Sequence, residues 1–109
     1  MRARVVFADS KVKEAYESLA GSKTEGRGLQ KRLDNAFDAI AKDAFCSIQI
    51  PKKQIPKEYI AKYGIENIWK YNLASSWRLL YSVAGDEVIV LAIILEWLPH
   101  KEYERRFKY

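Results

Sequence analysis

The chain has 109 residues, of which 49% are apolar and 30% charged, and its formal net charge at pH 7 is +5. This length suits a single domain (1–109) and is too short for two, and the apolar content excludes a disordered chain. One cysteine, Cys46, and one histidine, His100, exclude an internal disulfide and a cysteine-rich zinc site. We therefore expect a globular domain of a reducing compartment that uses no metal and no small-molecule cofactor.

We find no segment suited to a membrane or to secretion. The first ten residues, MRARVVFADS, lack the apolar run of a signal peptide. The apolar segment Val88–Leu95 lies between two glutamates and is much shorter than the ~20 residues that span a bilayer. We expect a cytoplasmic protein with no membrane partner.

The N-terminal part of the chain predicts one strand and two helices. Alternating side chains predict a short strand over Arg2–Phe7. A helix follows, capped by Asp9 or Ser10 and ended by Gly21. After a glycine-marked connection, a second helix is predicted from about Gly28 to Lys42. Each helix has one apolar face, so the pair needs a surface to pack against.

The second half predicts a weak strand, a short helix, a further strand and a hairpin. In chain order these are Ser47–Ile50, Pro56–Gly64, Asn67–Leu73, and Trp77–Ala84 with Glu87–Leu95. A two-residue loop, Gly85-Asp86, suits a type II′ turn. If Ala84 pairs with Glu87 across this loop, Arg78 lies opposite Ile93 and Trp77 opposite Ile94.

This order of elements predicts an α+β domain. We expect a small antiparallel sheet with the two N-terminal helices on one face, an additional short helix, and an opposite face open for binding. We expect Trp77, Leu79 and Tyr81 under the helices and Arg78 on the open face, because a buried arginine without a partner costs several kcal/mol.

The last third of the chain holds the candidate catalytic side chains. Histidine is the side chain best suited to proton transfer near neutral pH, so His100 is the candidate acid or base, or else a solvent-exposed residue. Tyr103, one helical turn later, is a candidate hydrogen-bond donor or base-stacking ring, or a core aromatic. Arg78 is suited to a bidentate contact with phosphate, or to an ion pair with Glu96 or Glu102.

Further basic residues are candidates for contact with RNA, or are ordinary solvated charges. Lys70, on the strand before Arg78, would reach the same face of the sheet. The others lie in the mixed-charge segment after His100 and in a loop: Lys101, Arg105, Arg106, Lys52 and Lys53. The chain has no glycine-rich phosphate loop before a helix and no Ser-His-Asp spacing, which disfavours NTPase and dinucleotide enzymes.

In these features the chain resembles the RelE/ParE superfamily, the toxins of bacterial and archaeal type II toxin–antitoxin modules. The resemblance covers the two N-terminal helices, the segment Ile50–Leu73, the strand WRLLY (Trp77–Tyr81) and a last strand followed by His-x-x-Tyr (His100–Tyr103). It implies a RelE-like fold and a metal-independent mRNA endoribonuclease, or mRNA interferase, which in many members acts on the ribosome. It also implies an antitoxin protein as partner and mRNA as substrate.

The resemblance also implies roles for individual residues. Arg78 matches the strand arginine that holds the phosphate, and Lys70 matches the basic residue on the preceding strand. His100 or Tyr103 matches the C-terminal acid or base in a reaction where the ribose 2′-hydroxyl attacks the adjacent phosphate. The chain departs from the family pattern at Asn72, where some members have a second lysine.

A second departure lies at Glu96–Pro99, where a basic cluster often follows the last strand. Two alternatives to the nuclease stay open. One is a ParE-like toxin that inhibits DNA gyrase, and the other is an attenuated, noncatalytic RNA- or protein-binding module of the same fold. The presence of Arg78, His100 and Tyr103 favours the nuclease.

Overall fold

A computed structural model describes residues 2–22, 24–74, 76–85 and 90–107 of the chain. Within them the strands are β1 (Arg4–Phe7), β2 (Ile48–Gln49), β3 (Trp69–Asn72), β4 (Trp77–Gly85) and β5 (Val90–Pro99). The helices are α1 (Ser10–Ser18), α2 (Thr24–Lys42), α3 (Lys57–Tyr63) and α4 (His100–Arg106), with single 3₁₀ turns at η1 (Leu19–Gly21) and η2 (Lys52–Gln54). The predicted α+β class is confirmed.

The five described strands form one sheet in the order β1-β5-β4-β3-β2. Neighbouring strands are antiparallel except β1 and β5, which are parallel, with Val6 opposite Ile93. The prediction of a wholly antiparallel sheet is therefore wrong. The parallel pair joins the first strand of the chain to the last, and no local turn signal could reveal that pairing because parallel strands need a long connection.

The register of the β4–β5 pair also differs from the prediction. Ala84 pairs with Leu91, and Arg78 lies opposite Leu98, with a bulge at Leu80/Tyr81. Strand β5 continues through Glu96 to Pro99, where the prediction ended it at Leu95. Residues 86–89, which include part of the predicted two-residue loop, lie outside the described residues.

Contacts between residues close in the chain explain where α1 and α2 begin. Asp9 caps α1, since its Oδ1 accepts from the backbone N–H of Val12 at 2.9 Å. Helix α2 begins before Gly26 and Gly28, which we predicted to lie in a connection. A Cβ at Gly26 would lie 2.4 Å from Cβ of Ser22, so a glycine is required where the turn meets the helix.

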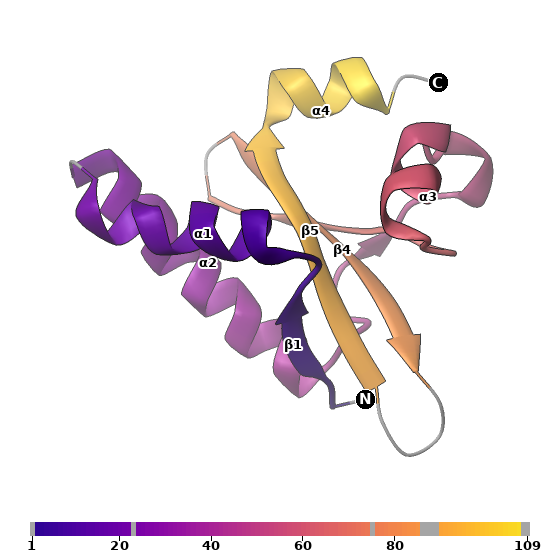
Figure 1. Cartoon of the computed structure of the whole chain (residues 1–109), viewed down its shortest axis with the longest axis horizontal. Helices are drawn as coiled ribbons and strands as arrows, with labels where there is room; N and C mark the ends of the chain where they lie inside the picture. The colour runs from indigo at the N-terminus through magenta and orange to yellow at the C-terminus, as the bar shows by residue number, and fades with distance from the viewer. Residues whose placement is uncertain (1, 23, 75, 86–89, 108–109) are drawn as a thin grey trace.

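Helices α1 and α2 cover one face of the sheet. Figure 1 shows them together on one side of β5, with α3 and α4 on the other. Leu33, Ala36 and Ile40 of α2 are buried in one cluster with side chains of β4 and β5. That cluster includes Leu79 and Tyr81, with Trp77 packed against it, so the prediction for this face is confirmed.

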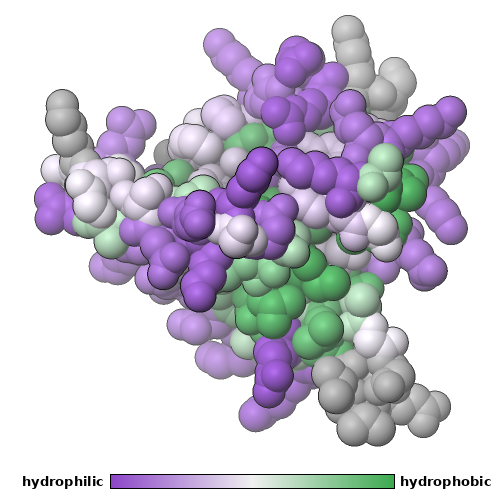
Figure 2. All heavy atoms as spheres, in the orientation of Figure 1, coloured by the Kyte–Doolittle hydropathy of each residue, from purple (hydrophilic) through white to green (hydrophobic). Residues whose placement is uncertain are grey.

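The opposite face is not open where α3 and α4 lie, and there the prediction of an open face is wrong. A second buried cluster joins Ile68, Leu80 and Leu95 of the sheet segment to Tyr59 of α3 and Tyr103 of α4. The reason is that β4 and β5 carry apolar side chains on both faces, and each face has to be removed from water. The cover is partial, since apolar side chains stay visible near the lower part of the view in Figure 2.

Among the described residues, no helix is both long and apolar enough to span a membrane.

The burial pattern predicts the effect of truncating a core side chain. Leu33 is 0% exposed in α2, so Leu33→Ala should lower the free energy of unfolding by roughly 2–5 kcal/mol. Ile48→Ala is the control, because Ile48 is 54% exposed in β2 and should cost about 0.5 kcal/mol or less. Urea unfolding followed by circular dichroism measures both. Equal losses in the two variants would contradict this description of the core.

Candidate functional site

Two of the candidate cations lie on the same face of the sheet. In the β3–β4 register Asn72 is opposite Arg78 and Lys70 is opposite Leu80. Residues directly opposite each other share a face, as do residues two apart along a strand. Lys70 and Arg78 therefore lie on the face that α3 and α4 cover, near the end of β5.

Helix α4 brings Tyr103 to this face. The ammonium nitrogen of Lys70 lies 4.9 Å from the centroid of the Tyr103 ring, a cation–π distance. Tyr103 is 5% exposed, and its ring stacks on Phe107 with centroids 4.8 Å apart. The ring of Tyr103 is thus a core aromatic that also contacts Lys70.

Arg78 is partly buried, and its guanidinium has one described hydrogen bond. Its NH1 donates to the backbone carbonyl of Trp77 at 3.0 Å. Among the described residues it forms no ion pair. Its two expected partners, Glu96 and Glu102, contact Arg105 and Arg106 instead. The rest of its N–H groups have no partner among the described residues.

His100 is the first residue of α4 and follows β5 without a linker. Its backbone N–H donates to the backbone carbonyl of Ser76 at 2.5 Å, and Pro99 before it pairs with Trp77 in the sheet. This register places His100 at the same end of the β4–β5 pair as Arg78. The imidazole Nε2 contacts the carboxylate of Glu104, one turn later in α4. Nδ1 is buried and makes no hydrogen bond with any described group.

The candidate RNA contacts are divided among three environments. Lys101 is exposed on α4. Lys52 and Lys53 are exposed in η2, which follows the edge strand β2, and no described contact joins them to His100 or Arg78. Arg105 and Arg106 are engaged by carboxylates, so their charge is largely compensated.

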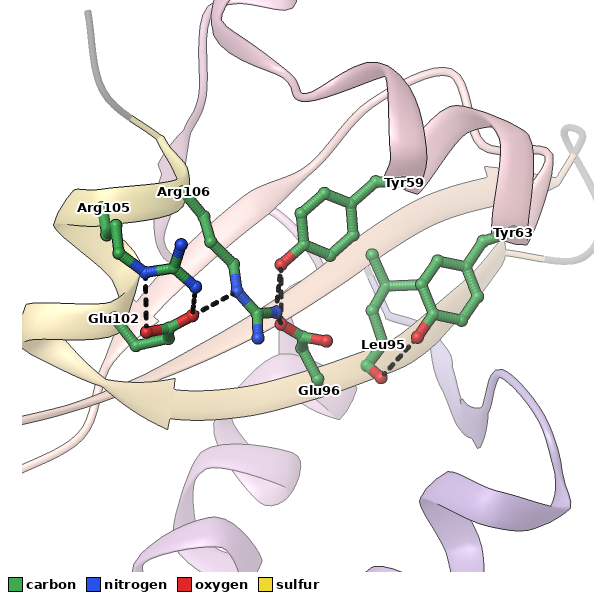
Figure 3. Close-up of polar contacts among 7 residues, drawn as sticks. All are labelled: Tyr59, Tyr63, Leu95, Glu96, Glu102, Arg105 and Arg106. Atoms are coloured by element: carbon green, nitrogen blue, oxygen red, sulfur yellow. Dashed lines mark hydrogen bonds and ion pairs between the residues drawn. The ribbon is translucent and has the colours of Figure 1, made fainter.

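Arg106 belongs to a polar cluster that links three elements, and the sequence analysis missed it (Figure 3). Its NH1 donates to Glu96 of β5 at 2.7 Å and to the hydroxyl of Tyr59 of α3 at 3.1 Å. The Tyr59 hydroxyl in turn donates to Glu96 at 2.6 Å. On α4 itself, Arg106 Nε donates to Glu102 at 2.8 Å, and Glu102 also accepts from Arg105. Helix α4 is thereby tied to α3 and β5.

These contacts shift the pKa values of the groups involved. Burial and the hydrogen bond to Glu96 raise the pKa of Tyr59, and the hydrogen bond with Tyr59 raises the pKa of Arg106. Hydrogen bonds from Arg105 and Arg106 lower the pKa of Glu102 to about 2. At neutral pH Glu102 is therefore ionised, and Tyr59 keeps its phenol proton.

Part of this cluster had a signal in the sequence. Glu102 precedes Arg105 and Arg106 by three and four residues, a spacing that brings opposite charges together on a helix. The contacts of Tyr59 with Glu96 and Arg106 had none, because they join residues far apart in the chain.

A hollow of about 480 Å³ lies over this cluster, and a second of about 400 Å³ adjoins it between α1 and α3. Both are lined by Lys62, Tyr63 and Glu96, so they meet at α3. Their walls carry acidic and basic side chains together. Neither hollow is a purely cationic groove of the kind that follows a nucleic-acid backbone.

Comparison with family models, curated proteins and solved structures finds no match to this chain. Among the described residues, no three His, Cys, Asp or Glu side chains are grouped so that they could hold a metal ion. The candidate site consists of two sheet cations, Arg78 and Lys70, with Tyr103 against Lys70 and His100 at the same end of the β4–β5 pair as Arg78.

The pKa shift of Glu102 gives a pH prediction. Its folded pKa, about 2, lies below the ordinary value of 4.5. The ionised carboxylate therefore contributes stability that is present above pH 4.5 and is lost as the pH falls toward 2. A ¹³C NMR titration should show the low pKa in the natural chain. In an Arg105→Gln/Arg106→Gln variant it should return toward 4.5, and a pKa that stays low would contradict this cause.

Proposed function

We propose that this protein is an mRNA endoribonuclease of the RelE-like type, a cytoplasmic toxin that is neutralised by an antitoxin protein. In this proposal the substrate is mRNA, on the ribosome or free, and the reaction uses protein side chains alone. One observation carries it: Arg78 and Lys70 share a sheet face at the end of β5, where His100 begins α4.

The proposed reaction is an internal transfer at one RNA phosphate. The ribose 2′-oxygen forms a bond to phosphorus and gives its proton to solvent. The bond from phosphorus to the 5′-oxygen breaks, and His100 protonates that oxygen through Nε2, the nitrogen that contacts Glu104 in the free chain. The products are a 2′,3′-cyclic phosphate and a 5′-hydroxyl end. The imidazole is suited to this proton transfer near neutral pH.

Arg78 and Lys70 stabilise the charge that develops on the phosphorane. The planar guanidinium of Arg78 can make two parallel N–H contacts to phosphate oxygens, and its single described hydrogen bond leaves those groups available. Lys70 supplies a second positive charge, and the Tyr103 ring holds its ammonium group in position. Tyr103 is thus assigned to positioning, because its ring is buried.

The acidic residue Glu96 does not weigh against this proposal. It lies opposite Leu80 in the β4–β5 register, two residues before the partner of Arg78. An unpaired carboxylate there would repel an RNA phosphate. However, Glu96 accepts hydrogen bonds from both Arg106 and Tyr59, so its charge is compensated.

The test is RNA cleavage by variants of the two central residues. We expect Arg78→Ala and His100→Ala each to lower the cleavage rate by at least ~10²-fold, because each removes transition-state stabilisation or proton transfer. Purified protein is assayed on RNA alone and on translating ribosomes, with mapping of the 5′ ends. Arg32→Ala is the matched control, since Arg32 is an exposed arginine of α2, away from the site.

The outcomes of this test are distinct. Equal activity in the natural chain, Arg78→Ala and His100→Ala would overturn the assignment of these residues. Absence of cleavage, together with gyrase inhibition that survives both substitutions, would favour the ParE-like alternative.

A further inference from the structure

The position of helix α4 relative to the sheet is set at both of its ends. At its start, His100 follows Pro99 of β5 directly, so the first turn is tied to the strand. Past its last turn, Phe107 is buried in the second core cluster. The seven-residue helix is too short to be stable by itself, so its orientation depends on these tertiary contacts.

The polar contacts of Arg106 fix that orientation more sharply than apolar packing does. The guanidinium uses NH1 for Glu96 and Tyr59 and Nε for Glu102, so two edges of a rigid plane are held. Tyr59 and Glu96 also bind each other, which closes a triangle among α3, β5 and α4 (Figure 3). Apolar contacts are non-directional, whereas these hydrogen bonds require one geometry.

The proposed reaction depends on the same helix orientation. His100, Tyr103 and Arg106 are spaced by three residues, so each is a neighbour of the next on the surface of α4. Arg78 and Lys70 belong to the sheet. A rotation or shift of α4 would therefore move His100 and the Tyr103 ring relative to both cations, and a displacement of about 1 Å can cost about 10²-fold in rate.

We propose that Tyr59, Glu96 and Arg106 are positioning residues, which hold α4 so that His100 and Tyr103 face Arg78 and Lys70 in the reactive geometry. This inference rests on the proposed endoribonuclease activity. It also moves Arg106 from the candidate RNA contacts to an internal structural role, because its described N–H contacts are with the protein itself.

The chain offers a matched pair of substitutions. Tyr59→Phe removes the hydroxyl that bonds Glu96 and Arg106. Tyr63→Phe removes a hydroxyl from the same helix, one turn later, where it donates only weakly to the backbone carbonyl of Leu95 at 3.4 Å. Both variants keep the aromatic ring, so both should fold, and an unchanged circular dichroism spectrum verifies this.

We expect variants of the three positioning residues to lose turnover and not substrate affinity. Tyr59→Phe and Glu96→Gln should lower kcat for RNA cleavage by roughly 10- to 100-fold, with KM within about twofold of the natural chain. Tyr63→Phe should stay within about twofold in both constants. Arg106→Lys keeps the positive charge but loses the planar set of N–H donors, so its kcat should be higher than that of Arg106→Ala.

A second readout does not require activity. Hydrogen exchange of the α4 backbone amides should be faster in Tyr59→Phe and Glu96→Gln than in the natural chain and Tyr63→Phe, because a less tightly held helix opens more often. If the natural chain cleaves no RNA, the proposed function fails, and this exchange comparison still tests the hold on α4.

Three results would overturn the inference. The first is a normal kcat in both Tyr59→Phe and Glu96→Gln. The second is hydrogen exchange of the α4 amides that does not change in these two variants. The third is a rise in KM at constant kcat, which would make these residues part of substrate binding.

Discussion

The constraint on which the rest of the structure depends is that the β4–β5 pair is apolar on both faces. Leu79 and Ile94 pack toward α1 and α2, while Leu80 and Leu95 pack toward α3 and α4. A strand pair of this kind has to be covered on both sides, because apolar surface left in water costs about 25 cal/mol per Å². The domain therefore has three layers around a central pair of strands.

This requirement also explains where polar chemistry can occur. The face under α3 and α4 holds Lys70, Arg78 and Glu96 beside buried apolar residues. A charge at the margin of a core needs a partner or water. Glu96 has Arg106 and Tyr59, and Lys70 lies against the Tyr103 ring. Arg78 retains N–H groups without a described partner, and in the proposed reaction these groups contact the phosphate.

The short helix α4 connects these two aspects of the molecule. It closes the second core with Tyr103 and Phe107, and it carries His100 to the end of the strand pair. The same helix also carries the arginines that were candidates for RNA contact. The structure gives Arg105 and Arg106 carboxylate partners, so the positive charge of this segment is mostly used within the protein.

The sequence by itself determined the elements whose signals are local. A cap at Asp9 or Ser10, the apolar stripe of α2 and a strand at β4 each depend on neighbours in the chain, and all three were predicted. The positions of the candidate residues on their elements followed from the same patterns. Arg78 falls within β4, and Lys70 falls within β3.

Only the tertiary structure decided the contacts between distant segments. The parallel β1–β5 pair, the shifted β4–β5 register and the cover of the second face depend on which surfaces meet, and binary patterns do not encode that choice when both faces are apolar. The bond between Tyr59 and Glu96 joins residues 37 positions apart. Such a pair forms because burial brings the two groups together, and no spacing rule along a helix or strand predicts it.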